Sequence, residues 1–233
     1  MSRVALVTGA GRGIGLELCR QLLDSGDTVV ACPRQPDSAG LVGLALDYPE
    51  RLHQVAMDVA DAGSINAAAQ EVGRRVQHID LLFNSAGTYP KTDGGLEQFD
   101  PRNLVRAFEV NSLGPLLVAR AFLPLLRKGS ERRLIQLTSL MGSIADNTSG
   151  GSWSYRISKA ALNMAVRNLA HELGGEGFVC LAIHPGWLQT EMGGAQAPTA
   201  VREGTAEVLR VALESGPQDN GAFKGPGGKD LPY

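Results

Sequence analysis

The sequence has 233 residues, of which 29 are glycine, and its formal net charge is −2. Hydrophobic residues make up 43% of the chain and aromatic residues only 5%, so a core must be built mainly from aliphatic side chains. The length suits one domain, residues 1–233. The balanced charge excludes the basic surface that binds nucleic acid or an anionic membrane, and no apolar run approaches the roughly 20 residues of a bilayer span.

The cysteine and histidine residues bear on the cellular compartment and on metal binding. The three cysteines, Cys19, Cys32 and Cys180, are odd in number and lie inside apolar segments, which predicts reduced, buried thiols in a cytoplasmic protein. The four histidines show no metal-ligand spacing, so we expect no metal site.

Short aliphatic runs alternate along the chain with segments of helical periodicity. The runs are typical of strands buried on both faces and cover residues 4–7, 28–32, 53–57, 79–83, 134–137 and 179–183. The helical segments start near Ile14, Ser64, Pro101, Ser154 and Thr199. The third of them continues to Arg127 and contains Pro115 and Pro124, where we expect kinks. The alternation predicts an α/β fold, a doubly wound parallel sheet of about seven strands (the last a short one near Phe223) with helices on both faces.

A glycine-rich loop joins the first predicted strand to the first predicted helix. It reads Gly9-Ala10-Gly11-Arg12-Gly13-Ile14-Gly15, so the spacing is G-x₃-G-x-G rather than G-x-G-x-x-G. Glycines let the backbone turn sharply and approach a pyrophosphate, while the start of a helix offers free N–H groups and the positive end of its dipole. Because this glycine loop lies between a strand and a helix, it predicts a dinucleotide-binding site.

The end of the second predicted strand bears on which dinucleotide binds. An NAD site usually has an acidic residue there, about 20 residues after the glycines, to hold the ribose 2′-hydroxyl. This chain has Cys32-Pro33-Arg34 instead, and Arg34, together with Arg12 of the glycine loop, has the charge to pair with a 2′-phosphate. The residues thus favour NADP(H) over NAD(H). The alternative is that both arginines are simply exposed surface residues.

Tyr155 and Lys159 are four residues apart on one predicted helix, so their side chains share a face. A tyrosine with an ordinary pKa of about 10 is a weak acid at neutral pH, and an ammonium group beside it lowers that pKa towards the useful range. Ser139 follows a predicted strand and therefore lies at the carboxyl edge of the sheet, where ligands bind in open α/β folds. There its hydroxyl is placed to hydrogen-bond a substrate oxygen; the alternative is a turn-forming serine.

In chain order, these motifs resemble those of the short-chain dehydrogenase/reductase family. The resemblance covers residues 4–192 and includes the glycine loop, Asp58-Val59, Asn84-Ser85-Ala86-Gly87, Asn111, Ser139, Tyr155-x₃-Lys159 and Pro185-Gly186. It implies a Rossmann-type fold and an NAD(P)-dependent oxidoreductase. Other segments, including His184-Pro185-Gly186-Trp187, are similar to the C-factor and sniffer-like carbonyl reductases.

The resemblance implies a role for each of these residues. Tyr155 would be the general acid in reduction and the general base in oxidation, and Lys159 would lower its pKa and bind the nicotinamide ribose. Ser139 would hold the substrate carbonyl, and Asn111 would anchor a water that links Lys159 to solvent. The cofactor would also contact Asp58 and Val59 at its adenine, Asn84, Ser85, Ala86 and Gly87 at its adenosine ribose, and Pro185, Gly186 and Thr190 at its nicotinamide end. The structural alternative for Asp58 and Asn84 is that they cap a helix or a turn.

Two features depart from the family's pattern. Ser85 stands where the family more often has a second asparagine, which we expect to alter local turn bonding rather than chemistry. The gap between Ser139 and Tyr155 is longer than the family's usual spacing, so loop 140–153 is expected to enlarge the pocket wall.

Apolar side chains flank the predicted site. Candidates to line a pocket for an aliphatic or aromatic ketone or aldehyde are Met141, Trp153, Trp187, Leu188 and Met192, although a tryptophan there is as often simple packing. Residues 187–198 are expected to form a short substrate lid, mobile without cofactor because it is rich in glycine and alanine. Residues 216–233 form a glycine- and proline-rich tail without an assigned role.

The residues therefore predict an enzyme that moves a hydride between NADP(H) and a carbonyl/alcohol pair, without a nucleic-acid or membrane partner. The alternatives are a nucleotide-sensing or signalling protein on the same fold and an NAD-dependent alcohol dehydrogenase. A pure sensor has no need of Asn111, Ser139, Tyr155 and Lys159 together, and Arg34 argues against NAD. The resemblance further implies a homodimer or homotetramer, assembled through the helices that carry Asn111 and Tyr155.

Overall fold

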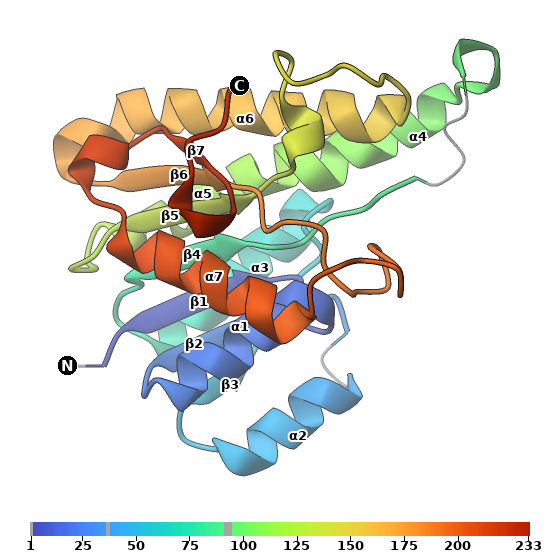
Figure 1. Ribbon diagram of the computed structural model, residues 1–233. Coiled ribbons are helices and arrows are strands. Elements are labelled where there is room, and N and C mark those ends of the chain that lie inside the picture. Colours follow the sequence, from blue (N-terminus) through green and yellow to red (C-terminus); the bar gives the residue numbers. More distant parts are fainter. Residues whose placement is uncertain (1, 36–37, 91–94) are drawn as a thin grey trace.

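The computed structural model describes residues 2–35, 38–90 and 95–233. Its central element is a seven-stranded parallel sheet with the order β3-β2-β1-β4-β5-β6-β7 (Figure 1). The strands are β1 Val4–Thr8, β2 Thr28–Cys32, β3 Leu52–Gln54, β4 Leu81–Asn84, β5 Arg133–Leu137, β6 Val179–Ile183 and β7 Phe223–Lys224. The predicted doubly wound α/β sheet is confirmed.

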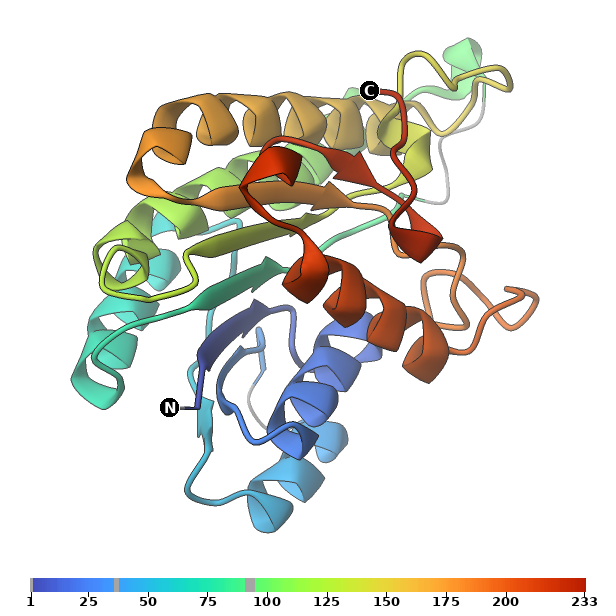
Figure 2. The ribbon, with the colours of Figure 1, turned by 60° about the vertical axis from the view of Figure 1, so that its left-hand side comes forward.

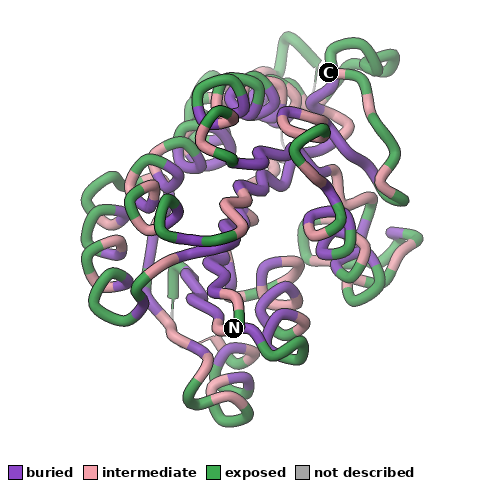
Figure 3. The backbone as a smooth tube through the Cα atoms, turned by 90° about the vertical axis from the view of Figure 1, so that its left-hand side faces the viewer, coloured by how far each residue is buried: buried purple, intermediate pink, exposed green. Residues whose placement is uncertain are grey.

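Helices cover both faces of this sheet, as Figure 2 shows. One face packs on α3 (Ala62–Arg75), α5 (Gly114–Leu126) and α6 (Trp153–Leu173), and the other on α1 (Gly13–Asp24), α2 (Ala39–Asp47) and α7 (Val201–Glu214). Buried residues follow the strands and the inner sides of the helices, while the outer turns are exposed (Figure 3). The strands are apolar on both sides for this reason. The three cysteines are free and buried within these two layers, as predicted.

Helix α2 is present in the structure but was not predicted from the periodicity of the sequence. Its nine residues include Gly40 and Gly43, and glycine is a poor helix former. Tertiary contacts hold the helix instead: Leu41 and Leu44 are buried in the core that also contains α1. Gly40 lies so close to α1 that a Cβ on it would come within 2.3 Å of the Leu16 side chain. The prediction missed α2 because packing rather than propensity stabilises it.

The long helix predicted from Pro101 is interrupted before the first of its two internal prolines, Pro115. A π-helical turn, Glu109–Leu113, joins α4 (Pro101–Phe108) to α5. Pro115 has no N–H to donate to the carbonyl of Asn111, four residues earlier, so the regular helical bonding breaks within this turn. Pro124 lies inside α5 without ending it.

The same stretch, Pro101–Leu126, is long and apolar enough to cross a membrane by length and composition, because it contains a window of 18 residues with a mean hydropathy of 1.2. Half of that window is buried, and the helices of the stretch pack within the fold, α5 against α3 and α4 against α6. Packing within the fold therefore accounts for the buried part of this apolar stretch.

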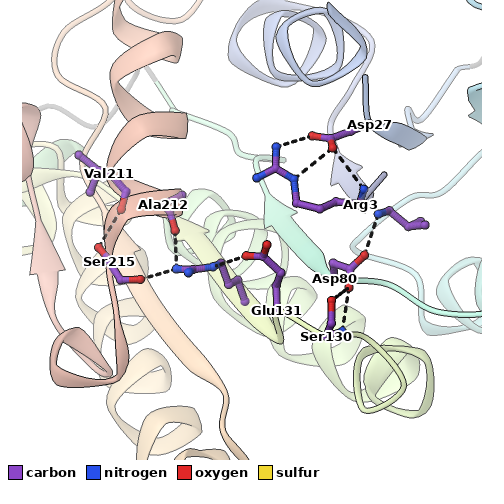
Figure 4. Close-up of polar contacts among 10 residues, drawn as sticks. Arg3, Asp27, Asp80, Ser130, Glu131, Val211, Ala212 and Ser215 are labelled. Carbon is purple, nitrogen blue, oxygen red and sulfur yellow. Dashed lines mark hydrogen bonds and ion pairs between the residues drawn. The ribbon is translucent and has the colours of Figure 1, made fainter. Parts of the chain in front are cut away.

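Buried charged groups hold the amino ends of the strands together (Figure 4). Asp80, just before β4, is 2% exposed and accepts hydrogen bonds from the main-chain N–H groups of Val4 (2.9 Å) and Ser130 (2.8 Å) and from the Ser130 hydroxyl (3.0 Å). Burial alone would raise the pKa of Asp80, but these hydrogen bonds outweigh it and keep the pKa below its usual value. Beside it, Arg3 donates to both carboxylate oxygens of Asp27, at 3.1 and 2.8 Å.

The glycine- and proline-rich tail folds back onto the sheet and supplies β7. Lys224 in this strand is 8% exposed and pairs with both Asp219 and Asp230, each at 2.8 Å. The main-chain oxygen of Tyr233 accepts a hydrogen bond from the N–H of Ala145 at 3.1 Å. The tail therefore reaches the loop that precedes α6 and supports it from outside.

Candidate functional site

The glycine loop turns between β1 and α1 in conformations that most side chains avoid. Gly9 has a φ of +64° and Gly13 a φ of +53°, both in the left-handed region that favours glycine. A Cβ on Gly9 would lie 2.7 Å from the Cα of Ala86, in the loop after β4. Thr8 joins the same two loops, because its hydroxyl accepts the N–H groups of Ser85 and Ala86, each at 3.1 Å. The loops after β1 and β4 meet here because glycine permits it.

The start of α1 fits a dinucleotide pyrophosphate. Its N-cap residue, Arg12, makes no side-chain cap hydrogen bond, which leaves N–H groups of the first turn for an anion. Gly15 approaches the loop backbone so closely that a Cβ would lie 2.3 Å from the carbonyl oxygen of Gly9. Gly11 lies in the same loop, and Ile14, in the first turn of α1, packs on the core. The glycine loop thus offers free main-chain N–H donors, and its lack of side chains lets the pyrophosphate of a dinucleotide approach the backbone.

The two arginines predicted to read the cofactor lie on the surface at this edge. Arg34 follows β2 and is exposed, next to Pro33, which a Cβ on Gly11 would contact at 3.5 Å. Arg12 forms an ion pair with Glu191 of the predicted lid, and the two side chains are 71% and 74% exposed. Both arginines are therefore accessible to a charged ligand, with Arg12 already paired across to the lid.

Three residues predicted to contact the adenosine end have structural partners. Asp58 accepts the N–H of Ala60 at 2.9 Å and so closes the turn before α3. Val59 is buried, packed in the core beneath α3 and α5. Asn84 is also buried and donates to the carbonyl of Pro115 at 3.3 Å. The turn and tethering roles of Asp58 and Asn84 are thus present in the structure, and their cofactor contacts stay predictions.

The residues predicted for the nicotinamide end follow β6. Pro185 and Gly186 leave the strand with a φ of +89° at Gly186. Thr190 lies against the glycine loop, where a Cβ on Gly13 would be 3.6 Å from its methyl group. The predicted lid therefore begins beside the glycine loop, and its mobility stays a prediction.

The four predicted catalytic residues converge, buried, at the carboxyl edge of the sheet. Ser139 follows β5, Tyr155 and Lys159 lie on α6, and Asn111 lies in the π-helical turn, with exposed fractions of 8%, 9%, 4% and 0%. The Ser139 hydroxyl lies near the Tyr155 phenol and favours a lower pKa for it. The Lys159 Nζ donates to the carbonyl of Leu137 at 2.8 Å and lies 5.8 Å from the centroid of the Tyr155 ring.

Burial sets the protonation of the tyrosine and the lysine. It raises the pKa of Tyr155 to about 12 against the opposing hydrogen bond from Ser139, and it lowers the pKa of Lys159 to about 8. Burial dominates the pKa of Tyr155 in the protein without cofactor, where the ammonium donates to the Leu137 carbonyl. The expected lowering of this pKa by Lys159 stays a prediction. At neutral pH, Tyr155 is a phenol that holds a proton it can donate.

Asn111 ties the loop after β4 to α6. Its Oδ1 accepts the N–H of Thr88 at 2.8 Å, and its Nδ2 donates to the carbonyl of Thr88 at 2.9 Å and to the Ser158 hydroxyl at 3.0 Å. Gly87 precedes this anchor, and a Cβ there would be 3.9 Å from the Lys159 Nζ. Because Gly87 has no side chain, nothing from this position covers the Lys159 ammonium. The water expected at Asn111 stays a prediction.

The predicted substrate-lining residues divide into two groups. Four of them are partly or largely exposed: Met141, Trp153, Trp187 and Met192. Leu188 differs, because it is 3% exposed and packs on α7, where a Cβ on Gly204 would come within 2.2 Å of it. The structure thus places Leu188 in the packing against α7 and leaves the other four at the surface.

Tyr89 lies at the reacting end and was not singled out by the sequence motifs. Its ring meets the Tyr155 ring with centroids 4.8 Å apart, and its hydroxyl is hydrogen-bonded to Ser152 at 2.8 Å. The signal that could have found it is its place two residues after Gly87, in a loop at the carboxyl end of a strand.

Known proteins resemble this chain along its length. A family model described as short chain dehydrogenase matches residues 3–200. C-signal of Myxococcus xanthus is 44% identical over 155 residues, which cover 66% of this chain and 93% of that protein. The structure of an NADPH-bound carbonyl reductase from chicken fatty liver matches with a TM-score of 0.92 and 34% identity, over 100% of this chain and 99% of that one. The carbonyl reductase Sniffer of D. melanogaster matches with a TM-score of 0.94 and 30% identity, over the full length of both chains.

The matched region contains both the glycine loop and the buried group formed by Ser139, Tyr155 and Lys159. The order of the strands and the position of this group at their carboxyl ends agree with the same assignment. The chain therefore belongs to the short-chain dehydrogenase/reductase family of oxidoreductases.

Proposed function

We propose that this protein is an NADP(H)-dependent carbonyl reductase in which Tyr155 is the general acid. The observation that carries the proposal is the buried group of Ser139, Tyr155 and Lys159 at the carboxyl edge of the sheet, in which the phenol keeps its proton at neutral pH. A general acid must keep its proton until the substrate oxygen gains negative charge. Similarity to the NADPH-bound chicken carbonyl reductase supports the same reaction.

Each of these side chains would have a separate task in reduction. The bound dinucleotide would supply the hydride, and would accept it in the reverse direction. The Ser139 hydroxyl would donate a hydrogen bond to the carbonyl oxygen, and Tyr155 would transfer its phenolic proton to that oxygen as charge develops. Lys159 would stabilise the resulting phenolate as an ammonium ion, and a water at Asn111 would return a proton from solvent.

The cofactor is proposed to be NADP(H). Strand β2 ends at the fully buried Cys32, and the next charged residue is the exposed Arg34. A guanidinium there suits a 2′-phosphate, whereas an NAD site would offer a carboxylate to the ribose.

A signalling protein is the second candidate function, because one relative carries the name C-signal. The buried acid-base group argues for turnover, since a protein that only reports cofactor binding gains nothing from burying Tyr155 beside Ser139.

We further propose that the protein is a homodimer or homotetramer. The outward sides of α4, α5 and α6 carry exposed apolar side chains, namely Val105, Phe108, Leu116, Ile157 and Met164. Covering them with a second copy would remove this surface from water. Light scattering on the purified protein should give the mass of two or four chains, and Met164→Glu should reduce it; a monomeric wild type would overturn this proposal.

The proposed reaction is tested by NADPH consumption over a panel of ketones, aldehydes and diketones, each repeated with NADH. Tyr155→Phe keeps the ring but has no proton to donate, so we expect it to lose about 10²- to 10⁴-fold in kcat while still binding NADPH. Equal turnover by the wild type and this variant would overturn the assignment of Tyr155. NADPH binding without turnover of any panel member would favour the signalling function.

A further inference from the structure

The ring of Tyr89 forms part of the cover over Tyr155. The two rings meet edge to face, with centroids 4.8 Å apart and planes at 79°, an arrangement that aromatic pairs prefer. Tyr89 comes from the loop after β4 and Tyr155 from the first turn of α6. The contact therefore joins two separate segments at the group that holds the acid-base proton.

Ser152 holds the far end of the Tyr89 side chain. It occupies the N-cap position of α6, and serine is favoured there because its hydroxyl accepts an N–H from the helix. Ser152 makes no such cap hydrogen bond. Its hydroxyl is hydrogen-bonded to the Tyr89 hydroxyl instead, at 2.8 Å. The Ser152 side chain therefore contacts Tyr89, which packs on Tyr155, and does not cap the helix.

The backbone before α6 is bent into an unusual shape where this contact is made. Gly150, Gly151 and Ser152 follow one another with φ values of +63°, +69° and +44°. Glycine tolerates this left-handed region, but serine does not adopt it without strain. Within the described ranges, Ser152 and Arg132 are the two non-glycine residues with positive φ. Strain of this kind persists where surrounding contacts determine the conformation, and the bond to Tyr89 is such a contact.

The main chain next to Tyr89 is fixed as well. Both the N–H and the carbonyl of Thr88 are hydrogen-bonded to the Asn111 side chain, at 2.8 and 2.9 Å. Tyr89 therefore leaves an anchored main chain, ends on the Ser152 hydroxyl and places its ring against Tyr155.

We propose that Tyr89 is a positioning residue for Tyr155, and that the hydrogen bond between Tyr89 and Ser152, here called the clamp, holds the Tyr155 ring with its hydroxyl at Ser139. The inference rests on the proposed function of Tyr155 as general acid. Proton transfer is sensitive to small displacements of the donor. Loosening the clamp therefore lowers kcat while cofactor binding at the glycine loop stays intact.

Two single variants break the clamp from opposite ends. Tyr89→Phe and Ser152→Ala each remove one hydroxyl and keep the rest of the side chain. We expect each to lower kcat for carbonyl reduction about 3- to 10-fold, the range of one hydrogen bond, with KM for NADPH unchanged. Because both remove the same bond, the double variant should lose no more than either single variant. Tyr48→Phe is the matched control, since it removes an exposed hydroxyl bonded to Asp24, and it should leave kcat unchanged.

A second readout uses the protein without cofactor. In a Trp187→Phe background, Trp153 is the single tryptophan and directly follows Ser152. Breaking the clamp should free this segment and increase quenching of Trp153 fluorescence by acrylamide. Unchanged quenching together with unchanged kcat, or losses in kcat that multiply in the double variant, would overturn the clamp. Full activity of Tyr155→Phe would instead overturn the proposed function, and the quenching comparison would then still decide whether the clamp exists.

Discussion

The two edges of the sheet hold their buried charged groups in different ways. At the amino edge, Asp80 accepts hydrogen bonds from Val4 and Ser130, and these lower its pKa despite its burial. At the carboxyl edge, Lys159 is as deeply buried, and burial lowers its pKa to about 8, which disfavours its charged form. Partners stabilise the charge of Asp80 at the first edge, whereas burial at the second edge brings Lys159 closer to the balance between its charged and neutral forms. The comparison teaches that the amino edge serves stability and the carboxyl edge serves chemistry.

The largest expected effect comes from Lys159→Met, which keeps the length of the side chain and removes its charge. We expect kcat/KM for carbonyl reduction to fall about 10²- to 10⁴-fold. At pH 7 the free energy of unfolding should nevertheless rise by about 1–3 kcal/mol, because no ammonium has to be taken out of water. Chemical denaturation and steady-state kinetics on the same samples measure both effects.

The pH dependence of this stability gain has a defined sign. The pKa of Lys159 is about 8 in the folded protein against an ordinary value of 10.5. The gain from Lys159→Met should therefore be complete below pH 8 and should disappear as the pH rises through about 10.5. A variant less stable than the wild type at pH 7 would show that Lys159 is stabilised by partners, as Asp80 is.

Asp80→Ala tests the other edge. It leaves the N–H groups of Val4 and Ser130 without their acceptor, so we expect a loss of about 2–4 kcal/mol in the free energy of unfolding. The folded fraction should keep its kcat within about two-fold, since local changes at distant sites act independently. Urea denaturation measures the first effect. A fall in kcat at unchanged stability would reverse the comparison between the edges.

Arg34→Asp sharpens the assignment of the cofactor at the carboxyl edge. Loss of a charge-assisted hydrogen bond to a 2′-phosphate should raise KM for NADPH about 10- to 100-fold. KM for NADH should change far less, because NADH has no 2′-phosphate. Initial rates with both cofactors decide the matter, and equal changes in the two constants would contradict the NADP(H) assignment.

The smallest effect is expected from Glu191→Gln. It removes the exposed ion pair between the lid and Arg12, and such pairs contribute little. Freeing Arg12 for the cofactor phosphates should lower KM for NADPH at most about three-fold, and the difference should vanish at high salt. A larger change in KM for NADPH, or one that persists at high salt, would contradict the small contribution expected from this ion pair.

The sequence by itself determined the features that depend on neighbouring residues. The glycine loop, the apolar strands and the Tyr155-x₃-Lys159 pair are each set by local spacing, because a turn, a pleat or one helix face is completed within a few residues. The alternation of apolar runs with helical segments also predicted the parallel sheet, and with it the position of Ser139 at its carboxyl edge.

Only the tertiary structure decided what depends on residues far apart in the chain. Helix α2 forms through packing that its glycines do not predict, and Leu188, expected to line a pocket, is buried against α7. Burial by the surrounding elements raises the pKa of Tyr155, and the Lys159 ammonium donates to the Leu137 carbonyl. The clamp between Tyr89 and Ser152 joins residues 63 positions apart. Burial and the choice of partner are properties of the assembled fold, since distant segments supply both the cover and the hydrogen-bonding groups.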